Sequence, residues 1–263
     1  MKPKHMLVLF AAAMTALPTI AAETNTVSVT VWNGIFSRYV LEDQWVQYEH
    51  PVSQGAVRVT LNETPLKGAF AELWYSAPLD GTGFGSNTGS EFDPGVGWDG
   101  LLWKDAGIGG SFCYQIYDMM NSTIDGAEVG SIGKGDLHVF SGELNRAFQL
   151  GEKHTLTPFV RVKAVIPVEG EVPERGFLFF AGVRHGWKLM EKLELCHSFS
   201  LVKDDGLAGI QAGFLADYQL RLDWKPNERL TITPMSFRLA APLTVNDRET
   251  SKIVGCAVSW SIW

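Results

Sequence analysis

Apolar and polar side chains alternate with a period of two along most of this chain. In the last stretch, Ser251–Trp263, one face of an extended strand carries Val254, Cys256, Val258, Trp260 and Ile262. The opposite face carries small residues, namely Gly255, Ala257, Ser259 and Ser261. Because successive side chains of a strand point to opposite faces, this pattern predicts a β-strand with one apolar side.

Similar runs recur, and matching them to a period of two gives about twelve strands. The first run begins at Val27 and is predicted to continue past Gly34 to Val40. Asp136–Phe148 is also predicted as a strand, although its apolar face is ambiguous. No segment with helical periodicity follows Ala22, so the chain is predicted to be all-β.

The connections between the predicted strands fall into two groups. Short polar turns alternate with longer connections that are rich in Gly, Asp, Asn and Pro. The short turns are Glu63–Leu66, Gly151–Lys153, Met190–Glu191 and Lys225–Glu228. The long connections are Leu41–Pro51, Leu79–Ser90, Asn121–Gly135, Pro167–Arg175 and Ala241–Thr250, while Asp204-Asp205-Gly206 breaks the pattern. Short turns at one rim and long loops at the other are typical of an antiparallel transmembrane β-barrel.

The amino terminus carries an export signal. Met1–Ala22 has a basic start, an apolar run and a small-residue exit, which is the anatomy of a secretory signal peptide. Residues 23–263 then form one barrel domain, predicted to lie in the bacterial outer membrane in contact with its lipid. Without Lys2 and Lys4 the formal net charge of −7 becomes −9, and an acidic chain argues against nucleic acid as a partner.

If the apolar faces turn to lipid, a set of charged side chains lines the lumen. These lumen-lining candidates are Arg58, Glu72, Arg161, Lys163, Arg184, Glu194, Asp217, Arg221, Asp223 and Arg238. Six are cationic and four anionic, which predicts a weak preference for anions. Arg161 and Lys163 share one strand and one face, so they are expected to form the densest positive site.

The final strand is also expected to guide assembly. Closing strands of outer-membrane barrels end in aromatic residues, and here the assembly signal is predicted to be Val258, Trp260, Ile262 and Trp263. The expected partner is the cell's barrel-assembly machinery. Trp263 itself lies one position out of phase with the apolar face.

Catalytic and metal chemistry find little support in the sequence. The strongest catalytic candidate is the pair His197-Ser198, but neighbouring residues of a strand lie on opposite faces, so this His cannot easily orient this Ser. The histidines show no metal-ligand spacing. Glu91, Asp93 and Asp99 admit a calcium site, although turn residues are the preferred interpretation. We therefore expect no catalytic residues, no metal and no cofactor.

One part of the chain is similar to a known family. The matching segments are Ser37-Arg38-Tyr39-Val40, Pro51-Val52-Ser53-Gln54-Gly55, Gly68–Trp74 and Glu91-Phe92-Asp93. They resemble the opening of the TorF-like family of bacterial porins, over roughly residues 30–120. The chain departs from that family at Leu41-Glu42-Asp43, where the family tends to place an aromatic residue and Arg-Gly. The resemblance implies an outer-membrane barrel with a pore role.

The sequence thus favours a porin-like protein that gives small solutes or ions passive passage. Two alternatives stay open. One is an outer-membrane barrel enzyme that acts on lipid, and the other is a soluble extracytoplasmic β-sandwich that binds a ligand. The sorted connections argue against the sandwich, and the opposite faces of His197 and Ser198 argue against the enzyme.

Overall fold

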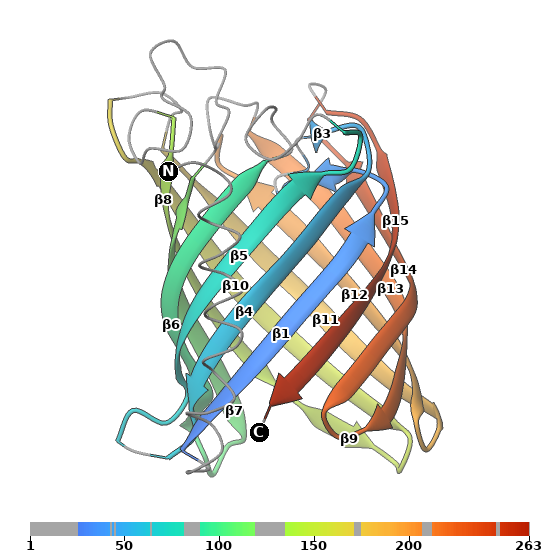
Figure 1. Cartoon of the computed structure of the whole chain (residues 1–263). Helices are drawn as coiled ribbons and strands as arrows, with labels where there is room; N and C mark the ends of the chain where they lie inside the picture. The colour runs from blue at the N-terminus through green and yellow to red at the C-terminus, as the bar shows by residue number, and fades with distance from the viewer. Residues whose placement is uncertain are drawn as a thin grey trace.

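A single antiparallel sheet closes on itself into a barrel of twelve strands (Figure 1). The computed structural model describes residues 26–42, 44, 46–63, 65–81, 90–118, 135–170, 175–206, 212–245 and 248–262. Within these ranges no helix is long and apolar enough to cross a membrane. The barrel strands are β1 (Val27–Phe36), β4 (Val52–Leu61), β5 (Ala69–Pro78), β6 (Glu91–Trp103), β7 (Ile108–Tyr117), β8 (Leu137–Arg146), β10 (His154–Pro167), β11 (Gly176–Met190), β12 (Leu193–Asp204), β13 (Gly213–Asn227), β14 (Leu230–Pro242) and β15 (Ser251–Ile262).

Closure comes from the two ends of the described chain. β15 pairs with β14 on one side and with β1 on the other, from Val29↔Ile262 to Phe36↔Gly255. Three further short strands are described: β2 (Tyr39–Val40), β3 (Val46–Tyr48) and β9 (Phe148–Leu150). β9 follows β8 and pairs with the first residues of β10. The closed barrel confirms the predicted fold class and excludes the β-sandwich.

The connections sort to two rims, as the sequence predicted. The strand ends that are joined by connections 37–51, 79–90, 118–136, 168–175 and 243–250 lie at the upper rim of Figure 1, and the short turns lie at the lower rim. The sequence predicted a short connection at Asp204-Asp205-Gly206, as an exception to the alternation, and this prediction is wrong. β13 begins only at Gly213, so eight residues separate it from β12, and the two strand ends that they join lie at the upper rim.

Inward and outward faces follow the predicted alternation. Many large apolar side chains face outward and are exposed, among them Val96, Phe112, Val160, Phe179, Phe199, Phe214, Val254 and Val258. Inside, an apolar cluster packs along β8, β10, β11, β12 and β13, together with Val245 after β14. Its strand members are Val139, Phe159, Val165, Leu178, Phe180, Val202 and Leu215. One wall of the interior is therefore packed, while charged side chains occupy other inward positions.

The first strand is shorter than predicted. β1 ends at Phe36 instead of reaching Val40, and Tyr39-Val40 form the separate strand β2, which pairs with β3. Tyr39 and Val40 are buried rather than directed to lipid. The chain therefore leaves the barrel wall after Phe36. A straight continuation of β1 would keep Tyr39 and Val40 in the wall and could not bury both side chains in the interior.

Candidate functional site in the barrel lumen

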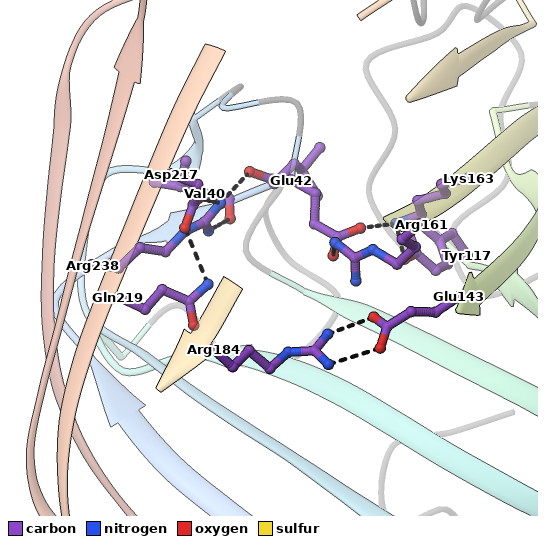
Figure 2. Close-up of polar contacts among 11 residues, drawn as sticks. Val40, Glu42, Tyr117, Glu143, Arg161, Lys163, Arg184, Asp217, Gln219 and Arg238 are labelled. Carbon is purple, nitrogen blue, oxygen red and sulfur yellow. Dashed lines mark hydrogen bonds and ion pairs between the residues drawn. The ribbon is translucent and has the colours of Figure 1, made fainter. Parts of the chain in front are cut away.

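The connection between β1 and β4 turns into the barrel and crosses the lumen (Figure 2). We call residues 37–51 the lumen loop. The part of this loop that lies deepest in the lumen contains Val40, Glu42 and Gln44. Gln44 is almost fully buried and has a left-handed backbone φ of 67°. A non-glycine residue in that region is uncommon, and it persists only where surrounding contacts fix it.

Glu42 joins the lumen loop to β10. Its Oε2 lies 2.7 Å from Lys163 Nζ, and its Oε1 lies 2.8 Å from Arg161 Nη2. Lys163 is buried and also donates to the hydroxyl of Tyr117. Burial by itself would raise the pKa of Glu42, but the charges of Lys163 and Arg161 outweigh it and hold that pKa well below its usual range. Glu42 is therefore an ionised link between the loop and the wall.

A second part of the barrel wall, at β14, holds the loop through its backbone. Arg238 on β14 donates from Nη1 to the carbonyl of Val40 at 2.9 Å and from Nη2 to that of Leu41 at 3.2 Å. The same guanidinium donates from Nε to Asp217 at 2.7 Å. A planar fork with five donors suits such simultaneous contacts to carboxylate and carbonyl.

Two further contacts fix the loop. Gln44 Nε2 donates to the carbonyl of Ala216 on β13 at 2.8 Å, and the Tyr39 hydroxyl donates to the buried carboxylate of Glu91 on β6. The loop is therefore attached to strands on three sides of the barrel. It narrows the lumen at the level of Glu42.

All ten lumen-lining candidates lie on inward positions of the strands, and most pair along the wall rather than across the lumen. Arg58 pairs with Glu72 at 2.7 Å, Arg221 with Asp223 at 2.8 Å and Arg238 with Asp217. Glu194 pairs with Lys225 near the lower rim. Arg184 forms a two-pronged pair with Glu143, which reaches over β10 from β11 to β8. Arg161 and Lys163 instead meet Glu42 of the loop.

Arg161 and Lys163 do not form the open positive site that their strand positions suggested. Both contact Glu42, and Arg184 and Arg58 likewise meet Glu143 and Asp99, none of which was among the ten candidates. The excess of positive charge that predicted an anion preference is thereby compensated. Period-two matching missed Glu42 because it lies in a loop, and missed Glu143 because the face of its strand was ambiguous.

Two hollows lie inside the barrel. One has a volume of about 450 Å³ and is lined by Arg184, Ser198, Gln219, Arg221 and Arg238 among others. The other has a volume of about 570 Å³, and its lining includes Arg58, Glu72, Asp99, Glu143 and Arg161. Polar and charged residues are the majority of the lining residues in both hollows, although apolar residues such as Phe237 and Ile253 also line the first.

The remaining candidate residues are placed as follows. His197 faces outward and accepts or donates a hydrogen bond with the Tyr218 hydroxyl at 2.8 Å, whereas Ser198 faces inward opposite Arg184. Glu91, Asp93 and Asp99 face inward on β6, but no group of acidic, His or Cys residues in the described ranges is arranged to hold a metal ion. Val258, Trp260 and Ile262 lie outward on β15, and Trp263 is outside the described residues.

Comparison with solved structures gives the same architecture. The NanC porin superposes with a TM-score of 0.53 at 10% identity, over 88% of this chain and 98% of the porin. The fold is a barrel of the outer-membrane type. An outer-membrane channel of Pseudomonas putida F1, described as COG4313, gives a TM-score of 0.54 at 10% identity over 92% of this chain and 97% of the channel. The β domain of the Bordetella autotransporter BrkA gives 0.51 at 14% identity, over 89% of this chain and 99% of that domain.

These likenesses show the fold alone, because porins and an autotransporter domain share it at low identity. No protein-family model matches the chain, and no curated protein is detectably similar to it in sequence. The specific resemblance to TorF-like porins therefore stays a prediction.

Proposed function

We propose that this outer-membrane-type barrel is a porin-like channel that gives small hydrophilic solutes or ions passive passage. The observation that carries the proposal is the inversion of polarity across the barrel wall. Apolar side chains such as Phe112, Val160 and Phe199 are exposed outward, while Arg, Lys, Glu and Asp side chains face inward. A water-soluble protein of this size rarely exposes so continuous an apolar surface, whereas a membrane barrel requires it.

Tryptophans support the same orientation in lipid. Trp187, Trp224 and Trp260 are exposed outward close to the short-turn ends of β11, β13 and β15. Aromatic girdles mark the membrane interfaces of such barrels, and short turns face the periplasm. We infer that the long-loop rim faces the exterior, after export directed by residues 1–22 and assembly that depends on β15.

The lumen loop sets the size of the passage. Because it is attached to β6, β10, β13 and β14, solutes must move beside it, through the two polar hollows. Paired charges along this route favour small polar solutes without a strong preference for anions.

Reconstitution in planar bilayers tests the proposal. Wild-type protein is expected to give discrete conductance steps with cation-to-anion selectivity near unity. Insertion without conductance, checked by heat-modifiable gel migration in the same membranes, would refute channel function.

An enzyme that acts on lipid is the second candidate, and the structure gives it little support. Ser198 faces the lumen and His197 faces outward, so the two side chains are on opposite sides of β12. A serine nucleophile needs a base within hydrogen-bond reach. Phospholipid hydrolysis that is lost in Ser198→Ala would nevertheless establish this second function.

A further inference from the structure

Three histidines lie side by side on the outward face of the barrel. His154 Nδ1 is 3.1 Å from His185 Nε2, and their rings stack with centroids 5.3 Å apart. His185 lies directly opposite His197 on the next strand, with ring centroids 5.7 Å apart. His197 is bonded to Tyr218. We call His154, His185, His197 and Tyr218 the histidine ladder, which crosses β10, β11, β12 and β13.

The ladder faces away from the lumen. Arg184 and Ser198, the chain neighbours of His185 and His197, face one another on the inward side. The outward residues above the ladder on these strands are apolar and exposed, including Val160, Phe179 and Phe199. The ladder is therefore a polar stretch within the surface that we have proposed to contact lipid, and the inference below rests on that proposed placement.

The hydrogen bonds within the histidine ladder involve only some of its ring nitrogens. Each imidazole has two ring nitrogens. The bonds among the described residues involve Nδ1 of His154, Nε2 of His185 and Nδ1 of His197. One nitrogen of each ring is thus left for a partner outside the chain, and a polar group without a partner in hydrocarbon costs several kcal/mol.

The tryptophan girdle indicates where that partner lies. Trp187 stacks on His154 with a centroid separation of 5.6 Å, and it belongs to the girdle near the short turns. The ladder begins at this level, where phospholipid headgroups and ester groups are found.

A second copy of the chain is a poorer partner. The outward positions of β10 to β13 carry no carboxylate that could accept from an imidazole of a facing copy. Phosphate oxygens of a lipid are strong acceptors for N–H donors. We propose that the histidine ladder binds the phosphate of a phospholipid in the leaflet at the short-turn rim, with Trp187 packed against the lipid.

Native mass spectrometry of the detergent-solubilised full chain with added phosphatidylethanolamine tests this inference. The wild type is expected to retain the lipid, and the triple variant His154→Leu, His185→Leu, His197→Leu is expected to bind it about tenfold more weakly. His138→Leu is the matched control, because His138 is also outward and bonded to a tyrosine, Tyr114, but lies at the opposite rim. Heat-modifiable migration verifies that each variant is folded.

A conservative variant and a conductance measurement separate the outcomes. His185→Gln with His197→Gln keeps N–H donors and should retain most of the lipid. Equal lipid retention by the wild type and the triple variant would overturn the inference. So would a lipid-free dimer that only the wild type forms. Displacement of the bound lipid by glycerol phosphate alone would also overturn it. Because the ladder is outside the lumen, the triple variant should conduct as the wild type does. Retained lipid without conductance would defeat only the channel proposal.

Discussion

Glu42 and Lys163 are 121 positions apart in the chain, yet their side chains meet in the lumen with Oε2 and Nζ 2.7 Å apart. The contact connects a loop to the barrel wall, and Arg161 shares the same carboxylate. Charge pairing in a partly buried setting is screened less than at a surface. This group of three charges therefore attaches the lumen loop to β10 and sets the local charge of the passage at that point.

Glu42→Gln should change both properties. The substitution leaves Arg161 and Lys163 without their counter-charge and weakens the attachment to β10, so conductance should rise and selectivity should shift toward anions. Reversal potentials in a salt gradient measure the shift. Glu49→Gln is the control in the same loop, because Glu49 is largely exposed and its pair with Arg38 contributes little. Identical reversal potentials for wild type and Glu42→Gln would contradict the assignment.

Charge reversal at the partner tests the contact itself. Lys163→Glu places a second carboxylate beside Glu42, so the loop should be repelled from β10 and single-channel conductance should increase with a cation preference. Combining it with Glu42→Lys restores opposite charges and should return conductance toward the wild-type value. A double variant whose effect equals the sum of the two single variants would show that the residues are not coupled.

The sequence predicted the strands of the barrel wall, and the direction of their side chains, better than it predicted the loop inside the lumen. Alternation fixes which strand residues face inward, so Arg58, Glu72 and Arg184 could be placed from period-two matching. The position of the loop could not, since it depends on contacts such as Arg238 with the Val40 carbonyl, which join residues 198 positions apart.

The connection at 205–212 shows a second limit. Tyr218, Leu220 and Leu222 alternate with Asp217, Gln219 and Arg221. Ile210 and Phe214 keep the same period, which predicts a strand over Leu207–Trp224. Periodicity alone therefore started the strand too early and made its loop look short. Where a strand ends is set by which backbone groups find partners, and here pairing begins at Gly213 with Asp204.

Asp118, just beyond β7 at the long-loop rim, should make heat stability depend on pH. Burial, and then the nearby charge of Asp136, raise its pKa to about 6. Below about pH 3.9, the pKa of an aspartate in the unfolded chain, Asp118 is protonated in both states and the folded protein has its full stability. As pH rises through about 6, the folded pKa, the buried group must ionise and that part of the stability is lost. After allowance for solvent screening, the loss is on the order of 1 kcal/mol.

Asp118→Asn should remove that loss, so its advantage over wild type is full at pH 7.5 and is nearly absent at pH 3, below both pKa values. The midpoint of heat-induced unfolding at both values measures the effect. Asp105→Asn serves as control, because Asp105 is exposed in the turn between β6 and β7. A parallel pH dependence in wild type and Asp118→Asn would disprove the prediction.

Removal of residues 259–263 should prevent assembly of the barrel. Ser259, Trp260 and Ser261 pair with β1 on one side, and Ser259 and Trp260 pair with β14 on the other. Their loss leaves backbone donors and acceptors on both neighbours without partners, and each such group in hydrocarbon costs several kcal/mol. Truncated protein should therefore fail to reach the membrane fraction and should lose heat-modifiable migration. Trp263→Phe keeps an aromatic terminus and every one of these pairings, so it should assemble normally. If the truncated chain inserted as efficiently as Trp263→Phe, closure by β15 would not be what stabilises the barrel.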